Sequence, residues 1–153
     1  YRYIIQNTLN RPGILCKGVS IYQGESDIDL MQQAASYIIG EHDFSSFRAA
    51  EDETKSSNRC VHFVNVSRIG QYIIFDIAAN AFLMHMVRNI VGSLLLVGNG
   101  TKTVDWFKQM FDAKDRTKAG PTAKPYGLYL VDVTYPQEFN LPKRECIGPI
   151  WMP

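Results

Sequence analysis

Two runs rich in β-branched and aromatic residues, at 60–67 and 72–78, are separated by only four residues, one of them a glycine. A connection this short makes adjacent strands antiparallel, so the two runs predict a β-hairpin. A third run of the same character opens the chain at residues 1–6, and a fourth lies at 128–135. Together they predict a largely antiparallel sheet.

Three amphipathic or apolar segments predict helices. Apolar residues recur at helical spacing in residues 27–39, and Ser26 or Asp27 is a suitable N-terminal cap. The most apolar segment, at 82–97, predicts a second helix, and residues 103–113 predict a third. The order of these elements indicates an α+β fold with helices packed on one face of the sheet. The length of 153 residues suits a single domain.

Charge and cysteine content narrow the possible functions. The chain has 16 basic and 15 acidic residues, whereas a dedicated nucleic-acid binder is usually far more basic. Charge therefore argues mildly against an RNA partner, unless local clustering supplies a basic groove. Three widely spaced cysteines, Cys16, Cys60 and Cys146, are typical of a reducing cytoplasm rather than of a disulfide scaffold. They form no ligand pattern with the histidines, so we expect no metal site.

The start of the chain and its apolar stretches bear on location. We recognise no signal peptide, and the longest apolar stretch is interrupted by Gly92 and Ser93 and is too short to span a bilayer. We therefore expect a cytoplasmic protein with no membrane contact. The chain starts at Tyr1 rather than at a methionine and enters a strand-like run at once, which favours a segment of a longer protein.

Arg88 is the residue with the most demanding chemistry. It lies beside the broad apolar face of the helix predicted at 82–97. A buried guanidinium is costly unless it pairs with an anion, and its planar fork suits a carboxylate or a phosphate. A structural ion pair, or a side chain whose charged end reaches solvent, is the more common explanation of such arginines. The residues alone leave both interpretations open.

Several aromatic and basic residues are weaker candidates. Tyr1 and Tyr3 alternate on the first predicted strand and face one side, where rings can stack on a base or simply pack. Arg48, Lys55 and Arg59 fall near loop or strand ends, where they can contact phosphates or form a solvated surface. We find no phosphate-binding glycine loop, nucleophile elbow or pair of catalytic carboxylates.

The chain resembles the tRNA pseudouridine synthase A family over nearly its whole length. The signature segment is residues 80–97 (NAFLMHMVRNIVGSLLLV). Further similar segments, in the order of the family, are residues 1–5 (YRYII), 42–49 (HDFSSFRA), 114–117 (KDRT), 127–131 (GLYLV) and 147–149 (IGP).

The resemblance implies an isomerase that converts uridine to pseudouridine at positions 38, 39 and 40, in the anticodon stem–loop of tRNA. It implies a homodimer and neither cofactor nor metal. The family's catalytic aspartate lies in a Gly-Arg-Thr-Asp-Ala-Gly motif of the N-terminal half, and this motif is absent from the present sequence. We therefore expect residues 1–153 to be the C-terminal portion of the catalytic domain, inactive by itself.

The resemblance also implies roles for individual residues. Arg88 matches the family arginine that pairs with the catalytic aspartate, which would lower the pKa of that carboxyl group. Tyr1 matches the tyrosine that stacks on the target uracil after the base leaves the RNA stack. Phosphate contacts from Arg48, Lys55 and Arg59 are a weaker inference.

Two other functions remain open for the same fold. One is a non-catalytic RNA-binding module, whose binding to tRNA would weaken steeply with added salt. The other is a dimerisation module, whose self-association would appear in sedimentation at several concentrations.

Overall fold

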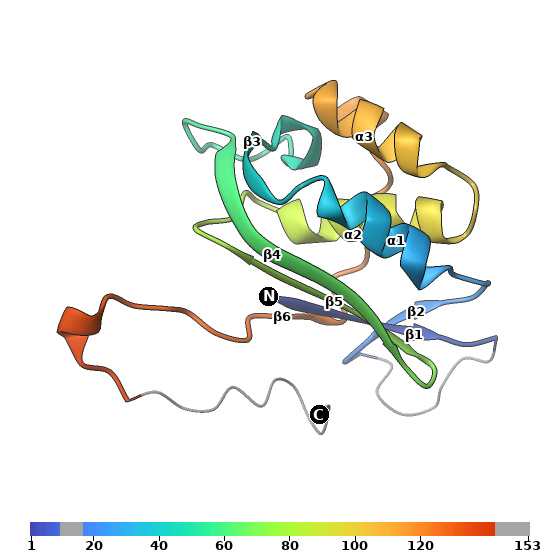
Figure 1. Cartoon of the computed structure of the whole chain (residues 1–153), viewed down its shortest axis with the longest axis horizontal. Coiled ribbons are helices and arrows are strands. Elements are labelled where there is room, and N and C mark those ends of the chain that lie inside the picture. The colour runs from blue at the N-terminus through green and yellow to red at the C-terminus, as the bar shows by residue number, and fades with distance from the viewer. Residues whose placement is uncertain (10–16, 143–153) are drawn as a thin grey trace.

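The computed structural model describes residues 1–9 and 17–142, which form a sheet with three helices on one of its faces (Figure 1). Residues 10–13, whose sequence Asn-Arg-Pro-Gly predicts a turn, lie outside these ranges, as does the family-like segment at 147–149. Cys16 and Cys146 lie outside them as well, and Cys60 is a free thiol.

The sheet is antiparallel except for one strand pair. Its order is β2 (Ser20–Tyr22), β1 (Arg2–Asn7), β5 (Tyr72–Ala79), β4 (Asn58–Ile69) and β3 (Gly40–Asp43), with β6 (Leu128–Tyr129) also pairing β1. Only β1 and β2 run parallel among these strands. The predicted α+β class and the predicted antiparallel sheet are confirmed.

The hairpin of β4 and β5 is tighter than predicted. Arg68 and Ile69 continue the ladder, pairing Ile73 and Tyr72, so the connection is shortened to two residues. Gly70, the first of these two, has φ of +56°, which a glycine adopts without steric cost. The hairpin provides the two long strands against which the helices pack.

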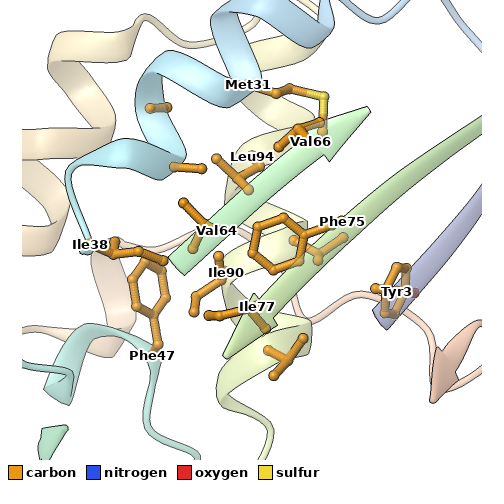
Figure 2. Packing of buried hydrophobic residues seen from close by; sticks show 14 of the residues in the cluster. Tyr3, Met31, Ile38, Phe47, Val64, Val66, Phe75, Ile77, Ile90 and Leu94 are labelled. Carbon is orange, nitrogen blue, oxygen red and sulfur yellow. The ribbon is translucent and has the colours of Figure 1, made fainter. Parts of the chain in front are cut away.

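The helices cover the sheet and enclose the core. They are α1 (Ile28–Ser36), α2 (Met86–Gly98) and α3 (Val104–Asp112), with short 3₁₀ turns at Ser45–Phe47, Arg116–Lys118 and Gln137–Phe139. The carboxylate of Asp27 accepts hydrogen bonds from two amides in the first turn of α1, and the Thr103 hydroxyl caps α3 in the same way. Figure 2 shows Ile90 and Leu94 of α2 packed with buried side chains of β4 and β5. In the part of the chain that the structure describes, no helix combines the length and apolar character needed to cross a bilayer.

Three predicted boundaries were wrong. The first helix, predicted over residues 27–39, ends at Ser36. The second helix begins at Met86, not at residue 82, because His85 has a left-handed backbone with φ of +60° and interrupts the helical path. The last strand has two residues rather than the eight of 128–135, because only Arg2 and Tyr3 pair with it.

Two short strands were not predicted. β2 pairs with β1, and β3 lies in the segment between the first helix and the predicted hairpin. Each has only three or four residues, too few to show a clear alternation of apolar and polar side chains.

Candidate active site

Arg88 lies in the first turn of α2 and is half-buried. Its Nε donates to the carbonyl oxygen of Ala123 at 2.7 Å, and the Ala123 amide donates back to the Arg88 carbonyl at 3.1 Å. Within residues 1–9 and 17–142, no acidic side chain forms an ion pair with Arg88. The guanidinium is therefore held at one nitrogen by a neutral carbonyl, and the anion that its partial burial calls for is not supplied by the described residues.

Tyr3, in β1, lies near the Arg88 guanidinium. Its side chain is fully buried, and its hydroxyl donates to the carbonyl of Lys124 at 2.6 Å and lies within hydrogen-bond distance of the Ser20 hydroxyl. Burial raises the pKa of Tyr3 above its ordinary value, while the Ser20 hydrogen bond and the positive charge of Arg88 oppose that rise. Tyr3 thus belongs to the core, as Figure 2 also shows, and lies within the electrostatic reach of Arg88.

Tyr1 lies at the start of the same strand and is half-buried. Its ring meets that of Phe82 edge-on, with the ring centroids 4.8 Å apart. Its carbonyl accepts a hydrogen bond from the Ile77 amide of β5 at 3.0 Å. Because Phe82 belongs to the segment that leads into α2, these contacts place Tyr1 beside the entry to the helix that carries Arg88.

Residues 120–127 form hydrogen bonds with β1 and with α2, and we call this segment the strap. On the β1 side, the Ile4 amide donates to the Gly127 carbonyl at 2.8 Å, and the Ser20 hydroxyl donates to the Tyr126 carbonyl. Tyr3 adds the hydrogen bond to Lys124. The strap therefore fixes the distance between the strand of Tyr1 and the helix of Arg88.

On the α2 side, the strap lies directly on the helix backbone. A Cβ atom on Gly92 would come within 1.8 Å of the Pro121 carbonyl oxygen, and one on Gly120 within 2.9 Å of the Ser93 Cα. The Gly120 amide donates to the Ser93 hydroxyl at 3.0 Å. Two glycines thus permit the close contact that brings the Ala123 carbonyl to Arg88.

Asp52 fixes the entry to α2 and was missed in the sequence. Its carboxylate accepts the Met84 amide at 2.6 Å and the Thr54 amide at 2.8 Å, together with the Thr54 hydroxyl. These hydrogen bonds, those of Thr54 foremost, lower the pKa of Asp52 to about 2. A sequence signal did exist, because an aspartate two residues before a serine or threonine favours this local turn. The same pattern recurs at Asp43 and Asp115.

Replacing Asp52 with asparagine should lower the melting temperature at pH 7. An asparagine that keeps its oxygen on Thr54 would present an amide nitrogen to the Met84 amide, and two donors cannot bond. Because folding depresses the pKa of Asp52, its contribution is complete above the ordinary carboxyl pKa of about 3.9 and is lost as the pH falls toward about 2. The difference between the variant and the native protein should therefore shrink across that interval.

Thermal unfolding between pH 7 and pH 2 checks this expectation, with Glu51→Gln as the control. Glu51 is the exposed neighbour of Asp52, so its replacement should leave the melting temperature nearly unchanged. Equal melting temperatures for Asp52→Asn and the native protein at pH 7 would contradict the role assigned to Asp52.

Of the three basic residues proposed as RNA contacts, Arg48 and Lys55 lie in the loop before β4, and Arg59 is the second residue of that strand. Arg48 donates to the carbonyls of Asp52 and Thr54 at 2.6 and 2.7 Å, so its guanidinium stabilises the loop itself. Arg59 donates to two carbonyls at the end of the loop, and Lys55 is exposed at its surface. Contacts of these residues with phosphate remain a prediction. Among the described residues, no group of three or more histidine, cysteine or acidic side chains is arranged to hold a metal ion.

Comparison with known proteins identifies the family. The sequence profile of the family described as "tRNA pseudouridine synthase" matches residues 34–136, which include α2 and the strap. The chain belongs to the tRNA pseudouridine synthase family. It is 57% identical to the "tRNA pseudouridine synthase A" of Shewanella sediminis and 59% identical to that of Shewanella pealeana, in each case over 99% of this chain.

A third relative, the "tRNA pseudouridine synthase A" of Shewanella amazonensis, is 58% identical over the whole chain. The chain spans 58% of the length of each of these three relatives. The resemblance stated from the motifs is therefore confirmed. For this pseudouridine synthase chain, the matched region contains Arg88, whereas Tyr1 precedes it.

Proposed function

We propose that the full-length protein isomerises uridine to pseudouridine at positions 38, 39 and 40 of tRNA, and that this chain is the C-terminal portion of its catalytic domain. The main support is the Arg88 guanidinium, which is half-buried, held by the Ala123 carbonyl and unpaired with any acid of the described residues. The relatives named tRNA pseudouridine synthase A support the same reaction.

In the reaction, the bond between N1 of uracil and C1′ of the ribose breaks, the base rotates, and a bond forms between C5 and C1′. The proton on C5 leaves and N1 gains a proton, so the product is an isomer of the substrate. An aspartate from the remainder of the protein acts either on the sugar or as a base. Both routes need an ionised carboxylate, and Arg88 maintains that state by lowering the carboxyl pKa through a paired charge.

Tyr1 is proposed to stack on the target uracil. Uracil inside an RNA stem is stacked on its neighbours, so the base must leave the stack before its glycosidic bond can be attacked. An aromatic ring compensates for part of the lost stacking. The edge-on contact with Phe82 fixes the orientation of the Tyr1 ring beside the start of α2.

The test compares the full-length protein with the 153-residue chain on an unmodified tRNA transcript. Pseudouridine, detected by mass spectrometry of nuclease digests, should form with the full-length protein and not with the chain alone. Absence of product with the folded full-length protein would reject the reaction. Product with the chain alone would reject the need for a carboxylate from elsewhere.

We also propose that the full-length protein works in the cytoplasm as a homodimer. The segment that follows β6 exposes large apolar side chains, namely Leu130, Val133, Tyr135, Phe139 and Leu141. Large exposed apolar side chains that lie this close together in sequence suit a protein interface. Sedimentation velocity at several concentrations of the full-length protein measures the oligomeric state, and a monomer at micromolar concentration would contradict the dimer.

A further inference from the structure

We propose that Arg116 is a positioning residue that sets the direction of the Arg88 guanidinium through the strap. The proposal rests on the proposed function, because the direction of Arg88 matters only if Arg88 pairs with a catalytic acid. Arg116 belongs to the 3₁₀ turn before the strap, far from Arg88 in sequence, and no pattern in the sequence links the two residues.

The Arg116 guanidinium joins the strap to α2. Its Nη1 donates to the Gly120 carbonyl at 3.0 Å, and its Nη2 donates to the Asn89 Oδ1 at 3.1 Å and to the Thr122 hydroxyl at 2.9 Å. One planar group thus contacts two residues of the strap and one residue of the helix. Asn89 is the immediate neighbour of Arg88, and Thr122 is the immediate neighbour of Ala123.

Asn89 makes this junction rigid. Its side chain is 1% exposed, and its Nδ2 donates to the Phe47 carbonyl at 2.8 Å, which fixes the amide orientation. Its Oδ1 also accepts the Thr122 hydroxyl at 2.7 Å. Because every polar atom of the Asn89 side chain is used, a shift of the strap would break hydrogen bonds inside the protein.

The strap residue that Arg116 holds is the immediate neighbour of the residue that binds Arg88. Thr122, held by Arg116 and Asn89, precedes Ala123, whose carbonyl accepts the Arg88 Nε. A guanidinium is planar, so a hydrogen bond at Nε orients its two terminal amino groups. Arg116 therefore acts on the catalytic pair without touching the substrate or the acid.

Within residues 1–9 and 17–142, no ion pair accounts for the charge of Arg116. Its acceptors in the described part of the chain are a carbonyl, an amide oxygen and a hydroxyl, and none of them is an acid. A guanidinium supplies five donors in a fixed plane, which lets one side chain reach both elements. A lysine has the same charge but cannot hold three acceptors in one plane. Replacing Arg116 with lysine therefore tests the geometry of the guanidinium while keeping its charge.

The experiment uses Arg116→Lys in the full-length protein, with Arg68→Lys as the matched control. Arg68 likewise donates to an asparagine oxygen, that of Asn7, and to a backbone carbonyl, that of Ser26, but it lies at the hairpin end of β4. Arg116→Lys should lower kcat roughly tenfold to 100-fold, as expected for a small misplacement of a reacting group. KM for tRNA should change less than about threefold, and Arg68→Lys should leave both constants nearly unchanged.

Two readouts separate positioning from a merely structural role. Combining Arg116→Lys with Arg88→Lys should cost no more turnover than Arg88→Lys alone, because both changes disable the same group. The ¹H–¹⁵N resonance of Arg88 Nε should shift in Arg116→Lys and not in Arg68→Lys. This resonance does not require activity, so it tests the positioning even if the full-length protein makes no pseudouridine.

Multiplicative losses in the double variant, an unchanged kcat in folded Arg116→Lys, or an unchanged Arg88 Nε resonance would each overturn the proposal. If Arg116→Lys does not fold, Thr122→Val replaces it, because this change removes the hydroxyl link and leaves Arg116 in place. Thr122→Val should then show the same loss of kcat and the same shift of the Arg88 resonance, and a normal kcat would overturn the proposal.

Discussion

Arg88→Lys in the full-length protein should lower turnover about 100-fold or more, the size of effect seen when one preorganised hydrogen-bond donor is removed from an active site. A lysine retains the positive charge, but its ammonium cannot donate to the Ala123 carbonyl and present a planar fork to a carboxylate at once. The acid is then poorly paired in a partly buried site, so its pKa rises and less of it is ionised. Binding of tRNA, which depends mostly on phosphate contacts, should change little.

Single-turnover kinetics and filter binding on the same preparation separate these two quantities. Arg68→Lys makes the same chemical change at the far end of the hairpin and should leave turnover normal. Near-normal turnover of folded Arg88→Lys would remove Arg88 from the active site and, with it, the main support for the proposed reaction.

Gly92→Ala should destabilise the protein by about 3 kcal/mol, at the upper end of what overpacking usually costs. Helix propensity alone predicts the opposite sign, a gain of about 1 kcal/mol, because alanine is the better helix former. The new Cβ would lie within 1.8 Å of the Pro121 carbonyl oxygen, which is backbone and cannot rotate away. Either α2 or the strap has to move, and the strap is held along its length by the contacts described above.

Chemical denaturation measures this change, with Gly70→Ala as the control. Gly70 has φ of +56° and open space around it, so alanine there meets only the local cost of a left-handed backbone, about 1 kcal/mol. A Gly92→Ala variant as stable as the native protein would show that the strap does not lie against the helix as described.

Local signals explain which parts of the fold the sequence predicted. The hairpin of β4 and β5 and the Asp27 cap of α1 depend on residues within a few positions of each other, and both were recognised. The start of α2 was misplaced because His85 adopts a left-handed backbone and Asp52, 32 positions before Met84, binds the amide of Met84. The length of β6 depends on β1, at the opposite end of the chain.

The candidate site likewise contains residues that the sequence revealed and residues that it did not. Arg88 was found because a charged residue beside an apolar helical face is unusual, and the resemblance to a known family then gave it a partner. Arg116 was not found, because its role consists of contacts with Asn89 and Gly120 that no periodicity reveals. Alternation left Tyr3 open to stacking on a base or to packing, and Ser20 and Lys124 hold it in the core.

The strap has a consequence for motion in this part of the protein. Its hydrogen bonds reach Ile4 and Tyr3 at one end and Arg88 and Ser93 at the other. Partial opening that frees β1 must therefore also loosen the start of α2, and the two elements should unfold as one cooperative unit. Thermal fluctuation then moves the Tyr1 ring and the Arg88 guanidinium together, which would hold the two groups proposed to act on uridine in a constant relation.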